Sequence, residues 1–304
     1  MALTNCPFCG AYATKVYLPN QKPRDTTHKP RNFLTCLDCG TVYPQPRVSL
    51  SELSKSSGLV GGYKFTPTPP EIVYRDFLLY HLKKYGVGTA LKTVLDIRSS
   101  DGNIVSILEK EGMDAYGIEA QQAAVDVAKN RNLKVYHGFF PDEIPEEIGK
   151  RRYDLILINE CIYYFEDIAA SLKKIKELLS ENGLLFIKTH QEDRDCYCGG
   201  QSSLFSGYGD QIQSIPTIYS LKHWLKSSGF ELLEILPYPF GDYYKFFINE
   251  KELSHGVSRK IKIGFNLIMP HQVANRFCHN MIEKSEDLWA RRVDRVTLIA
   301  KLTN

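Results

Sequence analysis

Four cysteines near the start of the chain form two pairs, Cys6 with Cys9 and Cys36 with Cys39. Two thiols separated by two residues can face one ion, and four thiolates suit a tetrahedral Zn²⁺. Glycine follows the second cysteine of each pair, where a tight turn favours positive φ. The spacing therefore predicts a closed structural zinc site, with residues 10–35 forming a long loop or β-ribbon. Free thiols and two disulfides are the alternatives.

A second group of polar residues follows predicted strands. Residues 96–102 read as a strand-to-helix turn, and Glu119 ends the next predicted strand. That spacing is close to the ~20 residues at which a carboxylate accepts the hydroxyls of an adenosine ribose. A solvent-facing acid is the alternative for Glu119. The predicted cofactor-binding residues are Asp96, Arg98, Ser99, Ser100, Gly102, Glu119 and Asn159.

The elements that must position these residues alternate along the chain. Short apolar runs predict seven strands, and amphipathic segments predict helices between them. This alternation predicts an α/β fold with a doubly wound, mostly parallel sheet, which binds ligands at the carboxyl ends of its strands. The strands are expected at 93–97, 115–119, 134–137, 153–158, 183–188, 230–236 and 295–302, and the helices at 103–111, 121–130, 167–180 and 220–228.

Three parts are predicted along the chain. Residues 1–47 form the zinc-ribbon module, and residues 48–90 form a linker followed by a helix at about 71–85. Residues 91–304 form the cofactor-binding domain, with an insert at about 238–290.

Composition narrows the class of protein. The chain has 304 residues, of which 43% are hydrophobic and 24% charged, as expected for a globular protein. It has neither a signal peptide nor an apolar run of the ~18 residues that cross a membrane, so we expect a cytoplasmic protein with reduced thiols. A net charge of +3 is too small to favour a nucleic acid or a membrane as partner.

Several of these segments resemble class I S-adenosylmethionine-dependent methyltransferases. The runs at 153–156 and 178–187 are similar to a recurring block of that family, and 219–230 resembles its helix–strand junction. The run at 36–44 resembles the zinc ribbon that precedes this domain in a subgroup. The resemblance covers most of residues 6–236. It implies a Rossmann-like sheet, S-adenosylmethionine as cofactor and methyl transfer as the activity.

The turn at 96–102 departs from the D-x-G-x-G-x-G pattern of that family, because Arg98 and Ser100 occupy two of its glycine positions. Glycine there lets the backbone approach the cofactor closely. Arg98 can pair with the cofactor carboxylate, point outward, or weaken the cofactor site.

A general base assists methyl transfer when the acceptor is an O–H, N–H or acidic C–H group. His190, just past the fifth predicted strand, is the first candidate, and Glu160 and His223 are the next. Tyr164 stands where the subgroup often carries a histidine, and a tyrosine there donates a hydrogen bond or packs beneath the site.

The sequence thus predicts a methyltransferase for a small-molecule acceptor, and the resemblance to the subgroup indicates a sugar or nucleotide sugar. An inactive relative that binds a partner through the zinc module is one alternative, favoured by the altered turn. An RNA methyltransferase is the other, favoured by basic residues such as Lys15 and Arg31 but opposed by the weak net charge.

Overall fold

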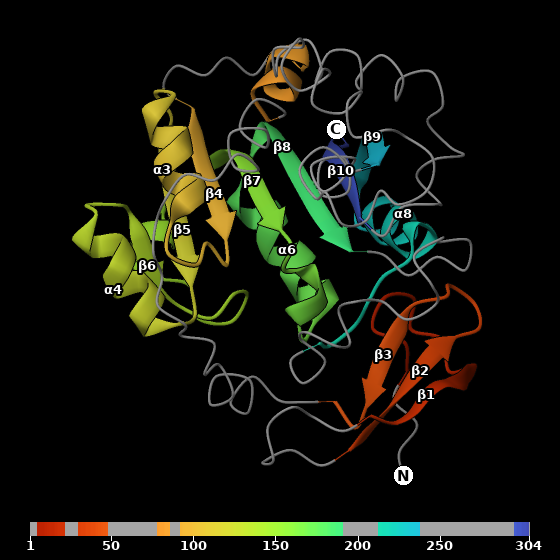
Figure 1. Cartoon of the computed structure of the whole chain (residues 1–304). Helices are drawn as coiled ribbons and strands as arrows, with labels where there is room; N and C mark the ends of the chain where they lie inside the picture. The colour runs from red at the N-terminus through yellow and green to blue at the C-terminus, as the bar shows by residue number, and fades with distance from the viewer. Residues whose placement is uncertain are drawn as a thin grey trace, which may run out of the picture.

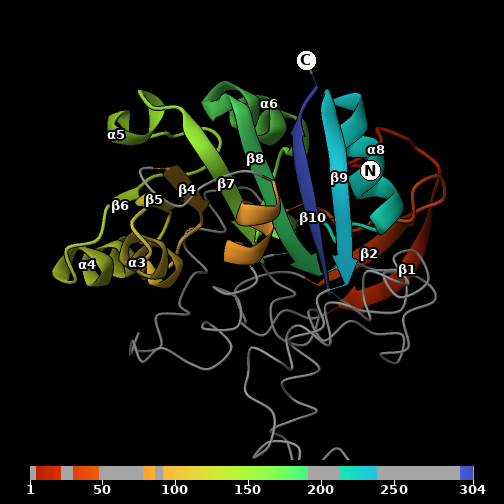
Figure 2. The ribbon, with the colours of Figure 1, turned by 90° about the horizontal axis from the view of Figure 1, so that it is seen from above.

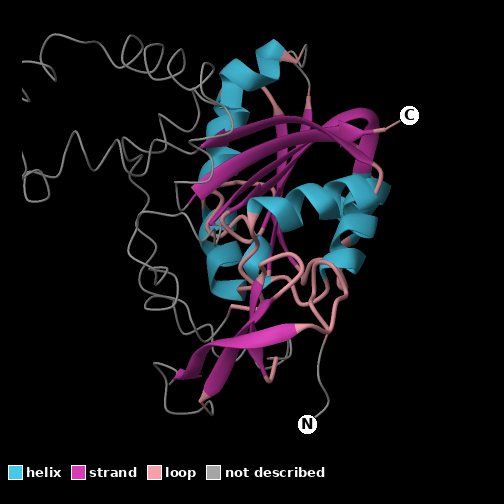
Figure 3. Cartoon of the chain, turned by 90° about the vertical axis from the view of Figure 1, so that its right-hand side faces the viewer, coloured by secondary structure: helices cyan, strands magenta, loops and turns pink. Residues whose placement is uncertain are grey.

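A computed structural model of the chain describes residues 5–21, 30–47, 78–85, 92–190, 212–237 and 295–303. They form a small three-stranded sheet and a seven-stranded sheet with helices on both faces (Figures 1 and 3). The predicted linker at 48–70 and the predicted insert at 238–290 lie outside the described residues. Among the residues described, no helix combines the length and apolar character needed to cross a membrane.

The small sheet includes the described residues between the cysteine pairs, so of the loop and the β-ribbon expected there the β-ribbon is found. It contains β1 (Thr14–Gln21), β2 (Arg31–Cys36) and β3 (Val42–Gln45), each antiparallel to its neighbour. Phe33 and Tyr43 are fully buried beneath it. Both belong to the same apolar cluster as Ile187 of the large sheet, so the ribbon and the large domain share a core.

The large sheet runs in the order β6-β5-β4-β7-β8-β10-β9 (Figure 2). Its first five strands are parallel, and β10 is antiparallel to both β8 and β9. The predicted seven-stranded, mostly parallel sheet is therefore confirmed. The strands are β4 (Thr93–Ile97), β5 (Asp114–Glu119), β6 (Val135–His137), β7 (Tyr153–Asn159), β8 (Leu179–His190), β9 (Phe230–Pro237) and β10 (Arg295–Leu302).

Helices cover the two faces of this sheet. One face packs against α3 (Asn103–Lys110), α4 (Gln122–Asn130) and helical residues 78–84. The other packs against α6 (Ile168–Leu178) and α8 (Ile218–Ser227), with the ribbon on the same side. Two short helices, α5 (Glu146–Gly149) and the 3₁₀ helix η1 (Ile162–Tyr164), complete the described elements.

The helix expected at 167–180 ends earlier than predicted. Asp167 caps its start by accepting a hydrogen bond from the Ala170 amide at 2.9 Å. At the other end Leu179 turns extended and pairs with Tyr153, so β8 begins directly after α6. Pairing with β7 overrides the helical pattern of the sequence at this point.

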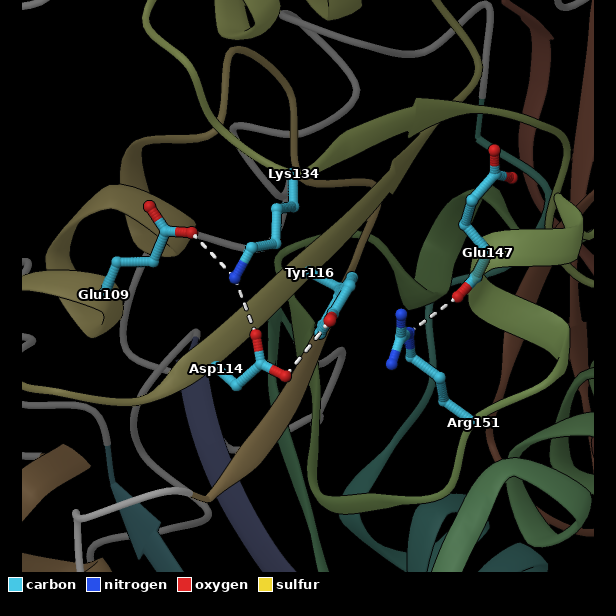
Figure 4. A network of polar contacts seen from close by, with 6 residues as sticks. All are labelled: Glu109, Asp114, Tyr116, Lys134, Glu147 and Arg151. Atoms are coloured by element: carbon cyan, nitrogen blue, oxygen red, sulfur yellow. Dashed lines mark hydrogen bonds and ion pairs between the residues drawn. The ribbon is translucent and has the colours of Figure 1, made fainter.

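A polar network fastens the amino edge of the sheet, opposite the edge where ligands are expected (Figure 4). Asp114 accepts hydrogen bonds from Lys134 at 2.6 Å and from the Tyr116 hydroxyl at 3.0 Å. The guanidinium of Arg151 lies 4.5 Å from the centre of the Tyr116 ring. Arg151 therefore packs against a residue of its own domain. This fits the ordinary surface role of a short basic run better than a basic patch that binds a partner.

Candidate active site and metal centre

The turn after β4 keeps the backbone shape of a glycine-rich turn without two of the glycines. The φ angles are 58° at Arg98, 53° at Ser100 and 78° at Gly102. Left-handed conformations of this kind cost an L-residue with a side chain about 1–2 kcal/mol. The turn therefore keeps the backbone path of a glycine-rich turn, although two of its glycine positions carry side chains.

Ser99 lies inside this turn and is buried. A Cβ atom at Gly117, on the neighbouring strand β5, would stand 2.3 Å from Ser99 Oγ. Gly117 is therefore required for the turn to sit against β5. Nothing in the sequence pattern pointed to this glycine, because its role depends on the pairing of β4 with β5.

Glu119 closes the same corner of the site. Its Oε2 accepts a hydrogen bond from the Ser100 amide and its Oε1 accepts one from the Gln121 amide, each at 2.9 Å. Each carboxylate oxygen has a second lone-pair direction, so these bonds leave acceptor capacity for a ribose. The structure thus joins Glu119 to the turn, and the ribose role stays a prediction.

Asp96 lies at the carboxyl end of β4 and is almost fully buried. Burial, with a further contribution from the charge of Glu119, raises the pKa of Asp96 to about 8. The carboxyl group is therefore mostly protonated at neutral pH, and a cation placed beside it would favour its ionised form.

Two buried polar atoms at this edge have no hydrogen-bond partner among the residues that the structure describes. They are Ser99 Oγ and Asn159 Oδ1, at the ends of β4 and β7. Buried polar atoms are nearly always paired, so such atoms at a ligand edge fit a polar ligand. Both were predicted as cofactor-binding residues, and that role stays a prediction.

Arg98 leaves the turn toward η1. Its guanidinium carbon lies 4.6 Å from the centre of the Tyr164 ring, a cation–π distance. The three outcomes expected for Arg98 stay open. Tyr164 packs against the guanidinium of Arg98, which keeps a positive charge beside the turn.

Glu160 and His190 come together at the ends of neighbouring strands. Glu160 follows β7 with a φ of 54°, and its carboxylate lies 3.5 Å from Lys188 Nζ and 3.6 Å from His190 Nε2. His190 is nearly buried, and its ring centre lies 6.0 Å from that of Tyr163. Two predicted candidates thus lie together with Lys188, and for the role proposed below we call Glu160, Lys188 and His190 the catalytic group.

Sequence reasoning missed Lys188 and gave Tyr163 only a packing role. Both lie within largely apolar runs that read only as core, although a lysine ending the apolar run 183–187 was a usable signal. His223 is an exposed residue of α8. No contact among the described residues joins it to the catalytic group.

The four N-terminal cysteines converge as predicted. Their sulfurs all lie within 4.8 Å of one another, with 3.5 Å between Cys6 and Cys39 and 3.6 Å between Cys9 and Cys36. Four sulfurs bound to one Zn²⁺ at ~2.3 Å stand about 3.8 Å apart in a tetrahedron, so the set matches in donor type and size. The hydrogen bond between the two thiols lowers the pKa of Cys39 and raises the pKa of Cys6, so one thiolate of this pair forms readily, and a zinc ligand must be ionised.

Both knuckles have the expected turn geometry. The Gly10 amide donates to the Cys6 carbonyl at 2.9 Å and the Gly40 amide donates to the Cys36 carbonyl at 3.0 Å. Gly10 and Gly40 have φ angles of 75° and 76°. The prediction of positive φ after each cysteine pair is confirmed.

Comparison with known proteins decides the family. A family model described as a methyltransferase domain matches residues 73–235, more than half of the chain. The chain belongs to the methyltransferase domain family. Together with the fold, this makes it a class I S-adenosylmethionine-dependent methyltransferase, and the resemblance seen in the sequence is confirmed.

Two curated relatives and one solved structure are similar to this methyltransferase. A ubiquinone biosynthesis O-methyltransferase from Coxiella burnetii is 28% identical over 178 residues, which are 55% of this chain and 74% of the relative. A tRNA U34 carboxymethyltransferase from Aliarcobacter butzleri is 31% identical over 91 residues, 30% of each chain. A proposed sarcosine dimethylglycine methyltransferase from Galdieria sulphuraria shares the fold, with a TM-score of 0.52, 15% identity, and coverage of 77% of this chain and 86% of its own.

Proposed function

We propose that this methyltransferase transfers a methyl group to a hydroxyl of a small-molecule acceptor, with His190 as general base. The observation that carries the proposal is the catalytic group at the carboxyl edge, where His190 Nε2 faces the Glu160 carboxylate at 3.6 Å. A carboxylate beside an imidazole orients the ring and stabilises the imidazolium that forms when the ring takes a proton. Lys188 Nζ lies 3.5 Å from the other oxygen of that carboxylate and helps to hold it in place.

The cofactor site is proposed along the ends of β4, β5 and β7. Bound S-adenosylmethionine supplies an electrophilic methyl group on a sulfonium sulfur. Glu119 accepts ribose hydroxyls, and Ser99 and Asn159 bind further polar groups through their unpaired oxygens. Arg98, held on Tyr164, offers its guanidinium to a carboxylate, and Asp96 faces a cationic group. His190 receives the proton of the acceptor hydroxyl.

Two observations bear on the acceptor. The Coxiella burnetii relative is named for O-methylation in ubiquinone biosynthesis, and this chain spans 74% of its length. The zinc-ribbon subgroup that the sequence resembles points to a sugar or nucleotide sugar. Both classes of acceptor present a hydroxyl group to a base, so the proposal rests on that shared chemistry.

The alternatives find less support. An inactive protein was suggested by the loss of glycines, but Arg98 and Ser100 hold the left-handed backbone that those glycines would adopt. An RNA methyltransferase is favoured by the Aliarcobacter butzleri relative, which matches over only 30% of each chain. The net charge of +3 also favours a small molecule.

We also propose that Cys6, Cys9, Cys36 and Cys39 hold a structural zinc ion. Four protein thiolates leave no coordination position for a substrate, so the ion would brace the ribbon and take no part in methyl transfer.

Isothermal titration with S-adenosylhomocysteine tests the cofactor site. We expect micromolar binding that Glu119→Ala weakens by about 1–3 kcal/mol, the cost of unpaired hydroxyls. Glu119→Gln keeps one carbonyl oxygen and should lie between the two. No binding at millimolar ligand by a folded protein would remove the proposed function.

A mass-spectrometric screen of phenols, catechols, sugars and nucleotide sugars tests the acceptor. A methylated product that requires His190, and is lost in His190→Gln while S-adenosylhomocysteine still binds, supports the role of the base. Methylation that proceeds unchanged in His190→Gln would reject that role.

A further inference from the structure

We infer that Thr217 is a positioning residue. It connects η1, which lies beside the catalytic group, to the cysteine ribbon, so that zinc binding at the ribbon sets the geometry around His190. The inference rests on the proposed zinc site. It connects two features that are far apart in the sequence through one segment, residues 212–217, which we call the bridging segment.

The first link joins the bridging segment to the zinc knuckle. The buried Thr217 hydroxyl donates a hydrogen bond of 2.6 Å to the carbonyl of Cys39, a predicted metal ligand. The Thr217 methyl group lies against Gly40, where a Cβ atom would approach it to 2.9 Å. Thr217 therefore contacts the Cys36–Cys39 turn through its hydroxyl and its methyl group.

The second link extends the ribbon. Val42, on β3, donates its amide to the Ile215 carbonyl at 3.0 Å, and the Ile215 amide donates back to Val42 at 2.6 Å. This isolated antiparallel bridge adds the bridging segment to the edge of the small sheet. Phe8 of the ribbon also packs edge-on against Trp224 of α8, with ring centres 5.7 Å apart.

The third link reaches the catalytic group. The amides of Gln213 and Ser214 both donate to the Tyr163 carbonyl, at 2.7 and 3.3 Å. The Tyr163 ring lies 4.5 Å from that of Tyr164 and 6.0 Å from that of His190. The bridging segment thus holds the backbone of η1, and the Tyr163 ring of η1 lies beside His190.

Thr217 also determines where the bridging segment ends. Its hydroxyl accepts a hydrogen bond from the Ser220 amide at 3.1 Å, and the Ser220 hydroxyl accepts one from the Thr217 amide at 2.9 Å. This reciprocal cap starts α8 at Ile218. The Thr217 hydroxyl therefore bonds both the start of α8 and the knuckle, and a knuckle without its metal would lose the fixed carbonyl that Thr217 binds.

Comparison of Thr217→Val with Thr217→Ser tests the inference. Valine keeps the shape and removes the hydroxyl, whereas serine keeps the hydroxyl. The readouts are zinc content, amide hydrogen exchange over 161–164 and 212–217, and the NMR titration of the His190 ring, assigned by the loss of its signal in His190→Gln. We expect Thr217→Val to retain zinc, to exchange roughly fivefold faster in both segments, as for loss of one hydrogen bond, and to shift the His190 titration. Thr217→Ser should restore both.

Thr93→Val is the matched control. Thr93 begins β4 at the amino edge of the sheet, at the opposite end of the strands from the catalytic group, so its loss should leave both readouts unchanged. If Thr217→Val gives the same exchange and His190 titration as the wild type, the inference is overturned. If Thr217→Val fails to fold, chelation of zinc from the wild-type protein carries the test, with the same two readouts expected to change.

The zinc site and its coupling to His190 can be rejected separately. A protein that takes up no zinc removes the metal site, and with it the zinc dependence inferred here. A protein that binds zinc, but whose exchange over 161–164 and His190 titration are the same after chelation, leaves the metal site standing and removes the coupling.

Discussion

Arg98 and Ser100 carry side chains through backbone positions that ordinarily favour glycine. Arg98 gains a cation–π contact with Tyr164, and the Ser100 amide gains the Glu119 carboxylate. These contacts offset part of the steric cost of positive φ. The strain therefore remains concentrated at the edge where the cofactor is proposed to bind, as is common at functional sites.

Ser100→Gly should increase the free energy of unfolding. Relief of about 1–2 kcal/mol of steric strain exceeds the ~0.5–1 kcal/mol of chain entropy that an added glycine costs. Urea denaturation measures the difference, and Ser106→Gly, in the middle of α3, serves as a control that should lose stability. A decrease for both variants would show that Ser100 is not strained.

Asp96 should make stability fall as pH rises. Its pKa of about 8 in the folded protein exceeds the ordinary value of 3.8, so the folded state binds the proton more tightly. That contribution is complete below about pH 4 and is lost as pH rises through 8. Asp96→Asn should therefore match the wild type near pH 4 and be the more stable protein at about pH 9.

Asp114→Asn is the control, because the contribution of Asp114 to stability has the opposite pH dependence. Burial opposes ionisation of Asp114, but hydrogen bonds from Lys134 and Tyr116 outweigh it and lower the pKa. Its contribution is thus present at neutral pH and lost in acid. Chemical denaturation across the pH range distinguishes the two, and parallel curves for Asp96→Asn and the wild type would refute the account of Asp96.

At the scale of elements, the short helix at 78–84 is joined to β9 by a buried acid. The Glu234 carboxylate lies 3.0 Å from His81 Nδ1 and also pairs with Lys84. Burial opposes ionisation of Glu234, and these hydrogen bonds outweigh it, so its pKa falls to about 2. The helix is therefore fastened to the sheet by charge as well as by Leu78 and Leu82.

Glu234→Gln should lower the free energy of unfolding at pH 7 by roughly 1.5–3 kcal/mol, the range for hydrogen bonds to charged groups. The depressed pKa makes this contribution complete above the ordinary value of 4.5 and lost as pH falls toward 2. Denaturation at pH 7 and pH 3 measures it. Glu231 lies on the same strand as Glu234 and forms an exposed pair with Lys301 of β10. Glu231→Gln removes that pair and should change the free energy of unfolding little.

The elements were largely predictable because strand and helix periods differ. The five parallel strands were expected within a few residues of where they lie, but the extension of β8 through Ser180–Asn182 was not. Those polar residues read as a turn, and only pairing with β7 holds Leu179 extended. The turns α5 and η1 are too short to show a period.

The site was predictable where a polar side chain lies at the end of a predicted strand. Glu160 and His190 were both expected there, and the parallel sheet brings them together. Lys188 was not expected, and Tyr163 was expected only to pack, because their contacts with Glu160 and with residues 213–214 join segments far apart in the sequence. Such contacts arise from tertiary structure and leave no local pattern in the sequence.

For the whole molecule, the cysteine ribbon is part of one apolar cluster with the large sheet. Loss of zinc should therefore destabilise more than the ribbon. Cys36→Ser should abolish zinc binding and lower the melting temperature, because a structural metal contributes directly to folding. Metal analysis and thermal unfolding measure both effects.

Cys161→Ser is the control for that variant. Cys161 is a buried thiol that donates to the Ile97 carbonyl at 3.3 Å, far from the cysteine ribbon in sequence. It should retain zinc. Unchanged metal content and melting temperature in Cys36→Ser would show that the four thiols hold no ion.

The position of β10 in the sheet has a consequence for synthesis on the ribosome. Residues 295–302 form a strand between β8 and β9, so the last described strand to be made lies inside the sheet (Figure 2). While residues 238–294 are being translated, β8 presents a bare edge and β9 has no described strand beside it. Unpaired edges of this kind recruit other chains. A premature stop codon before residue 295 would therefore yield a product prone to aggregation, even though the proposed cofactor and zinc residues would all be present.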